Sequence, residues 1–191
     1  MKWILNFILL MPALVFAGNG ADNTYTVAKD HSITIHGTSN LHDWTETAGI
    51  VTGNFNITWN NDGTFDIDAA SLKIDVRSIK SDHSAMDNNT YDALKANENP
   101  EILFILSTPV KNIQTKSGET TIFIKGNLSI AGVMKNVGLA VKVLIPAYRR
   151  LKFEGSQLIK LSDYNIDPPT ALFGALKTGN EIKVDFKIGL Q

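Results

Sequence analysis

Three histidines within twelve positions are the residues whose types and spacing most directly suggest chemistry. His31, His36 and His42 lie close to Asp30 and Asp43, and imidazole and carboxylate groups are common ligands of metal ions such as zinc. A metal site requires these side chains to converge on one point. His31 and His36 have opposite parity in an extended segment, and a turn separates them from His42. The sequence therefore favours hydrogen bonds at the surface or in turns over a metal site, and we expect no cofactor.

Ser39, His42 and Asp43 also contain the residue types of a hydrolytic nucleophile, base and orienting carboxylate. They are close only in sequence, and the chain has no Gly-x-Ser-x-Gly turn that would present a nucleophile. Cysteine is absent, which excludes thiol chemistry, cysteine metal ligands and disulfides. We therefore expect a non-catalytic protein with no catalytic residues.

A long hairpin from Thr121 to Ile145 is the strongest structural signal in the chain. Every second residue of each half is apolar or glycine, with a short turn at Ala131-Gly132 between the halves. Side chains alternate faces in a β-strand, so this pattern predicts two antiparallel strands with an uncharged inner face. Gly126 is the one inward position without a side chain, and it marks either a bend or room left for another group.

Similar alternation recurs along the chain and predicts an all-β antiparallel fold of roughly eight strands. Asn60-Asn61-Asp62-Gly63 is a hairpin turn between two such strands. The apolar parity changes in the returning strand, which predicts a β-bulge near Ala69 to Ser71. Residues 81–97 lose the alternation, and we expect one or two short helices there that cover one end of the sheet. These spacings are typical of a sandwich or a closed barrel.

The first 17 residues have the pattern of a secretory signal peptide. Lys2 precedes an apolar segment from Trp3 to Phe16 that is too short to span a membrane, and cleavage is expected after Ala17. Residues 18–23 are a short lead-in, and residues 24–191 form one domain. We expect a protein that is periplasmic or secreted, with no transmembrane segment in its mature form.

Charge argues against a nucleic-acid partner. Removal of residues 1–17 removes Lys2 alone among the charged residues and leaves 17 basic and 19 acidic residues. A net charge of −2 provides no basic surface for a phosphate backbone.

Several motifs, in order along the chain, resemble the YceI-like family of exported bacterial proteins. They are Leu41-His42-Asp43-Trp44, the segment from Ser71 to Ile79, the segment from Met86 through Leu94-Lys95 to Phe104, the segment from Gly126 to Val133, Ser162-Asp163-Tyr164 and Gly179-Asn180-Glu181-Ile182. The chain has Leu161 and Asn165 where that family often has Arg and Gly. The resemblance implies an extended, lipocalin-like antiparallel β-barrel that binds a polyisoprenoid or another long-chain amphiphile.

On this basis we expect an exported carrier of a hydrophobic small molecule, such as an isoprenoid or a fatty-acid-like lipid. The predicted lining consists of inward-facing apolar residues from several strands: Phe55, Leu72, Ile74, Phe104, Ile124, Leu128, Ile130, Leu139, Val141, Phe153, Val184 and Phe186. The alternative is a structural or stress-related interaction module whose barrel is filled by its own side chains. A homodimer is compatible with either hypothesis.

Three further aromatic and aliphatic residues are candidates for the mouth or lid of the barrel. Trp44 follows a turn and could cap the mouth or stack on a ligand, although packing at one end of the barrel is favoured. Leu172 and Phe173 lie in a long loop beside Pro168-Pro169. Such a loop is either a lid or a cover for the sheet edge, and the sequence does not separate these two roles.

Overall fold

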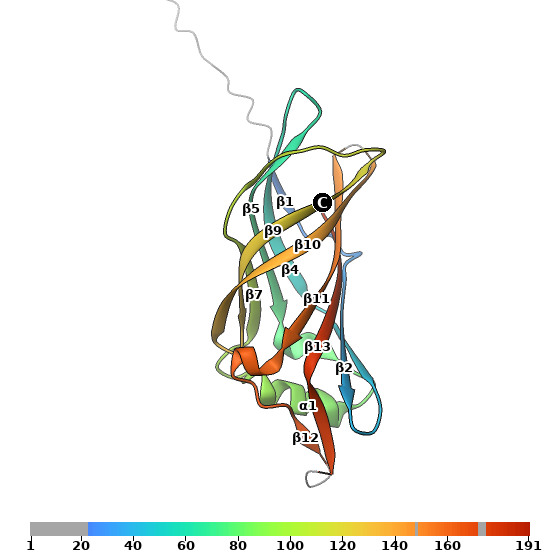
Figure 1. The fold of residues 1–191 in the computed structure, drawn as a ribbon, viewed down its shortest axis with the longest axis vertical. Helices are drawn as coiled ribbons and strands as arrows, with labels where there is room; N and C mark the ends of the chain where they lie inside the picture. The colour runs from blue at the N-terminus through green and yellow to red at the C-terminus, as the bar shows by residue number, and fades with distance from the viewer. Residues whose placement is uncertain (1–22, 148, 172–174) are drawn as a thin grey trace, which may run out of the picture.

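The computed structural model describes residues 23–147, 149–171 and 175–191. They form one antiparallel sheet of thirteen strands, which confirms the predicted fold class (Figure 1). The strands are β1 (Thr24–Thr26), β2 (Ser32–Ser39), β3 (Trp44–Ala48), β4 (Val51–Trp59), β5 (Phe65–Asp75), β6 (Ile79–Lys80), β7 (Glu101–Leu106), β8 (Val110–Ile113), β9 (Glu119–Ile130), β10 (Val133–Ala147), β11 (Arg150–Lys160), β12 (Thr170–Ala171) and β13 (Leu176–Gly189). The predicted signal peptide and most of the lead-in lie outside the described residues. Within them, no helix has the length and apolar character needed to cross a membrane.

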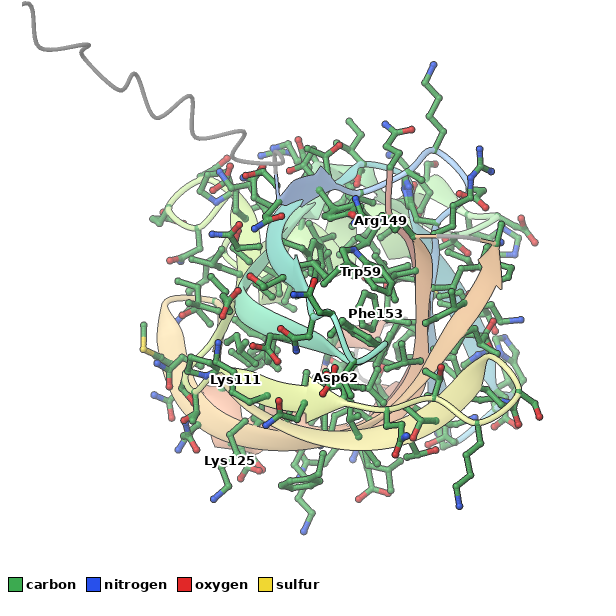
Figure 2. The ribbon with its side chains drawn as sticks, turned by 90° about the horizontal axis from the view of Figure 1, so that it is seen from above. Trp59, Asp62, Lys111, Lys125, Arg149 and Phe153 are labelled. Carbon is green, nitrogen blue, oxygen red and sulfur yellow. The ribbon has the colours of Figure 1, made fainter. Side chains whose placement is uncertain are left out.

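The sheet curls into a barrel because β1, at one end of its main path, meets the chain just beyond β13. Its main path runs β1-β4-β5-β7-β9-β10-β11-β13-β2-β3-β6. Just beyond β13, the backbone N–H of Gln191 donates to the Thr26 carbonyl at 3.0 Å, and the N–H of Thr26 donates back at 2.9 Å. Seen from above, the strands surround an interior that contains Trp59 and Phe153, whereas Lys125 points outward (Figure 2). The strand count exceeds eight because short breaks divide several of the predicted strands.

The predicted hairpin from Thr121 to Ile145 is confirmed as β9 and β10. Their register is continuous from Ile130 opposite Val133 to Glu119 opposite Leu144. Ala131 and Gly132 form the turn with positive φ angles of 49° and 80°, the conformation that a tight two-residue hairpin requires. This hairpin is the longest continuous wall of the barrel.

The β4–β5 hairpin contains the predicted bulge at a slightly different residue. Asn56 pairs with Ala69, but the next residue, Ile57, pairs with Ile67. Asp68 is therefore the extra residue, one position before the predicted range. It faces the outer side, where Thr58 donates to its carboxylate at 2.6 Å. The bulge lets the apolar residues on both sides of it remain inside a strongly curved sheet.

One helix, α1 (Ser84–Ala93), lies across the lower end of the barrel (Figure 1). This confirms the helical prediction for residues 81–97. Tyr91 fixes the helix to the chain before it, because its hydroxyl lies 2.9 Å from the carbonyl oxygens of both Arg77 and Ile79. Arg77 belongs to a short 3-10 helix, Val76–Ser78. A second 3-10 helix, Leu161–Tyr164, packs at the same end of the barrel.

The end of the barrel opposite α1 is filled by a dry core. Ile57, Phe65, Val143 and Leu151 are essentially inaccessible to solvent. Trp59 packs against Phe65 with ring centroids 5.2 Å apart. Close packing of large side chains leaves this half without space for a ligand.

Candidate ligand-binding cavity

The half of the barrel nearer α1 contains a cavity of about 470 Å³. This volume lies within the range of small-molecule binding sites, roughly 300–1,000 Å³. Most of its wall is aliphatic or aromatic, and the lining residues within the described part of the chain include neither Lys nor Arg. The barrel is therefore filled at one end and hollow at the other.

All twelve residues predicted to line a ligand site lie on the wall of this cavity. They are Phe55, Leu72, Ile74, Phe104, Ile124, Leu128, Ile130, Leu139, Val141, Phe153, Val184 and Phe186. Seven different strands contribute them, and the alternation of each strand turns its apolar residues inward. Their contact with a ligand stays a prediction.

An aromatic pair separates the cavity from the filled half. The rings of Phe55 on β4 and Phe153 on β11 are stacked, with centroids 5.7 Å apart and planes inclined by 9°. Both residues line the cavity, whereas Ile57, two residues after Phe55, and Leu151, two residues before Phe153, belong to the dry core. The pair thus forms the floor of the cavity.

Gly126 leaves room for an aromatic ring rather than for a ligand. A methyl group at this position would collide with the ring of Phe104 on the adjacent strand β7. The same relation holds between Gly155 on β11 and Phe186 on β13. Each glycine allows a phenylalanine ring to lie close to the backbone of the neighbouring strand, which widens the central cavity.

The cavity opens beside α1. Its lining includes His42 in the β2–β3 turn, His83 and Ala85 at the start of α1, and Thr170 on β12, and all four are exposed. Trp44 is partly exposed and also lines this end, and its indole N–H donates to the Thr38 carbonyl at 3.1 Å. The structure therefore places Trp44 at the cavity wall near the opening and not in the filled core. Leu172 and Phe173 lie outside the described residues.

The residues that suggested metal or hydrolytic chemistry make separate local contacts. The Ser39 hydroxyl accepts from the backbone N–H of His42 and donates to the His42 carbonyl, so it stabilises a turn. His31 bonds the Ala28 carbonyl, while His36 lies 3.2 Å from Asp185. Within the described ranges, no group of three or more His, Asp or Glu side chains could hold a metal ion.

A buried carboxylate on the cavity wall was missed by the sequence analysis. Glu46 on β3 is only 2% exposed and lines the cavity. Its Oε1 accepts a hydrogen bond from the Thr90 hydroxyl on α1 at 2.6 Å. Burial raises the pKa of Glu46, and the nearby Asp87 carboxylate raises that pKa further, although the Thr90 hydrogen bond opposes them. The alternation of Trp44, Glu46 and Ala48 was the available signal, because all three share one face of the strand.

Replacement of Glu46 by Gln is expected to change how the free energy of unfolding depends on pH. A buried carboxyl with a raised pKa keeps its proton in the folded state at pH values where the unfolded chain has lost it. Glu46 therefore makes folding less favourable as pH rises above its ordinary pKa of 4.5. Relative to wild type, Glu46→Gln should become progressively more stable in urea unfolding experiments as pH rises from 4.5 through the raised pKa of Glu46.

The control for this experiment is Glu98→Gln, which changes an exposed carboxyl just beyond α1. Other ionisable groups near Glu46 are Asp87, which is paired with Lys80 at 3.2 Å, and the cavity residues His42 and His83. They are present in wild type and in both variants, so they cancel in the comparison to first order. A stability difference for Glu46→Gln that does not vary with pH would contradict the expected effect of burial.

Comparison with known proteins identifies the family. The model of the YceI-like domain matches residues 25–190, which is nearly the whole described chain. The chain belongs to the YceI-like family. A comparison with curated protein sequences finds no match.

Solved structures share the fold of this YceI-like chain at low sequence identity. A polyisoprenoid-binding domain from Saccharophagus degradans has a TM-score of 0.71 and 15% identity, and the match covers 87% of this chain and 97% of that domain. BcnA from Burkholderia cenocepacia has a TM-score of 0.62 and 17% identity, with coverage of 83% and 95%. The Campylobacter jejuni YceI protein has a TM-score of 0.55 and 17% identity, with coverage of 75% and 82%.

Leu161 and Asn165, where the sequence differs from the pattern expected for the family, occupy defined positions in the structure. Asn165 ends the second 3-10 helix in the left-handed conformation, with a φ of 54°. Asn tolerates this conformation better than most residues other than Gly, so the turn forms without glycine. Leu161 is buried and lines the cavity. This YceI-like protein thus has an apolar side chain there in place of a cation.

Proposed function

We propose that this protein binds a long-chain hydrophobic molecule, with the chain of the ligand inside the cavity of the barrel. The observation that carries the proposal is a hollow of about 470 Å³ whose wall is almost entirely aliphatic and aromatic. The similarity of the fold to a polyisoprenoid-binding domain supports an isoprenoid as the ligand class. A polyisoprenoid or a similar amphiphilic lipid would fill such a space without unpaired polar groups.

The driving force for binding would be removal of apolar surface from water. At about 25 cal/mol per Å², burial of roughly 300 Å² of ligand surface contributes about 7 kcal/mol before the costs of association. The rigid, hydrogen-bonded wall of β9 and β10 is formed in advance, which limits the ordering cost. Such a protein acts as a carrier or a reservoir and needs no catalytic group.

We also propose that the protein is exported. The segment from residue 1 to residue 17 would direct the chain through a membrane, and the mature carrier would act in the periplasm or outside the cell. An exported carrier provides a dry compartment for a chain that is poorly soluble in water. A homodimer remains a prediction for this protein.

The direct test is to extract the purified protein with organic solvent and identify the extracted molecules by mass spectrometry. We expect a lipid with a long apolar chain in near-stoichiometric amount. Delipidated protein should then take up the fluorescent probe N-phenylnaphthylamine and release it when geranylgeraniol is added. Absence of an extracted lipid together with no probe uptake would contradict the carrier and favour an interaction module without a ligand.

A further inference from the structure

Among the described residues, the cavity wall has an acidic side chain but no Lys or Arg side chain. Glu46 is the only carboxylate among the described residues that line the cavity. A buried carboxylate in an apolar hollow is costly unless its oxygens accept hydrogen bonds. Its presence therefore requires a structural partner, a ligand partner, or both.

The structure supplies a partner for one oxygen of Glu46. Oε1 accepts from the Thr90 hydroxyl at 2.6 Å. No hydrogen bond from a described residue reaches Oε2. Yet no side-chain polar atom of the described residues is both sealed from solvent and unpaired. Oε2 therefore retains some accessible surface, and since Glu46 lines the cavity, we infer that this oxygen can accept a hydrogen bond from a molecule bound there.

Both elements that hold this group are firmly fixed. Glu46 lies opposite Ile35 in the β2–β3 pairing, and Ala48 two residues later pairs with Ile79 on β6. On the helix side, Asp87 accepts hydrogen bonds from the backbone N–H and the hydroxyl of Ser81 at 2.7 and 2.8 Å. Thr90, one turn further along α1, is thereby held against the strand. The acceptor is set in position before a ligand arrives.

The surroundings of Glu46 also select against negative charge. Asp87 is 5% exposed, and its nearest cation, Lys80, is already paired with it at 3.2 Å. The exposed His42 and His83 at the opening are the remaining titratable groups on the cavity wall apart from Tyr164. A phosphate or carboxylate near Glu46 would therefore meet acidic groups without a free Lys or Arg on the wall to neutralise it.

We propose that Glu46, oriented by Thr90, anchors the ligand by accepting a hydrogen bond from a hydroxyl head group, and that the site discriminates against anionic heads. This inference rests on the proposed carrier function and defines the ligand class more narrowly. The apolar chain would run from the anchor along the wall of β9 and β10 towards the floor at Phe55 and Phe153. The ligand is thus a long-chain alcohol and not its phosphate ester.

The test compares three probes with the same chain: geranylgeraniol, its methyl ether and geranylgeranyl phosphate. Affinities are measured at one pH, about 7.5, by displacement of N-phenylnaphthylamine from delipidated protein. Wild type should bind the alcohol about five- to tenfold more tightly than the ether, which cannot donate, because a single hydrogen bond contributes roughly 1 kcal/mol. The phosphate should bind more weakly than the alcohol by at least the same factor.

Two substitutions of Glu46 test separately its role as a hydrogen-bond acceptor and the effect of its negative charge. Glu46→Leu removes the acceptor and should bring alcohol and ether to equal affinity. Glu46→Gln keeps an acceptor oxygen but removes the charge, so it should retain the preference for alcohol over ether and relax discrimination against the phosphate. Thr47→Val changes the next residue on β3, which is exposed on the outer face, and should leave both ratios unchanged. Thermal unfolding verifies that each variant is folded.

The outcomes distinguish this inference from the function on which it rests. Failure of wild type to bind any of the three probes would count against the carrier function itself. Binding of all three with equal affinity, or unchanged ratios in Glu46→Leu, would overturn the anchor and leave the carrier function intact. Tighter binding of the phosphate than of the alcohol by wild type would also overturn it.

Discussion

Leu139→Trp is expected to weaken binding of geranylgeraniol by about tenfold or more, because the larger ring occupies space that the ligand needs. Leu139 lies on β10 opposite Ile124 of β9, and both line the cavity. The added ring enters a hollow and not a packed core, so the free energy of unfolding should change by less than about 1.5 kcal/mol. Probe displacement measures the first effect and urea unfolding the second.

The matched control is Ala140→Trp, which places the same side chain on the next residue of the same strand. Ala140 is exposed on the outer face, so its replacement should leave affinity within about twofold of wild type. Equal losses of binding in both variants would mean that the apolar face of β10 does not contact the ligand. Equal binding in Leu139→Trp and wild type would have the same meaning.

Phe65→Ala is expected to destabilise the protein by about 3–5 kcal/mol, the usual cost of truncating a buried phenylalanine. Phe65 is 1% exposed and packs against Trp59 in the filled half of the barrel. It does not line the cavity. The variant should therefore bind geranylgeraniol with nearly wild-type affinity at temperatures where it remains folded. Urea unfolding with parallel probe displacement measures both quantities.

Phe123→Ala is the control for this second prediction. Phe123 is 63% exposed on the outer face of β9, and its truncation should cost less than about 1 kcal/mol. A small loss of stability in Phe65→Ala would contradict the assignment of that half as a dry core. Together, Leu139→Trp and Phe65→Ala should separate binding from stability, since one half of the barrel supplies space and the other supplies packing.

Local alternation carried most of the fold prediction. The β9–β10 hairpin, its turn at Ala131-Gly132 and the bulge in β5 follow from rules that act over a few residues, namely the period of two and the conformations that Gly and Asn tolerate. The ordered motifs then indicated the YceI-like family, which the match over residues 25–190 confirms. The placement of all twelve predicted lining residues on the cavity wall also reflects this period, because parity alone assigns a side chain to the inside.

Parity could not decide which inward residues pack together and which leave a space. Phe65 and Phe153 are both inward aromatics, yet one lies in the dry core and the other forms the cavity floor. Their height along the barrel depends on strand tilt and register between residues far apart in the chain. Likewise, the space at Gly126 is taken by the ring of Phe104 from a different strand.

The sequence by itself determined an antiparallel barrel with an apolar interior, because side-chain alternation is a local property of each strand. Only the tertiary structure decided that this interior is half filled and half hollow. It also placed Glu46 of β3 against Thr90 of α1, 44 positions apart in the chain. That contact depends on where the helix crosses the end of the barrel. Such a position is set by long-range packing, which no pattern within a single strand encodes.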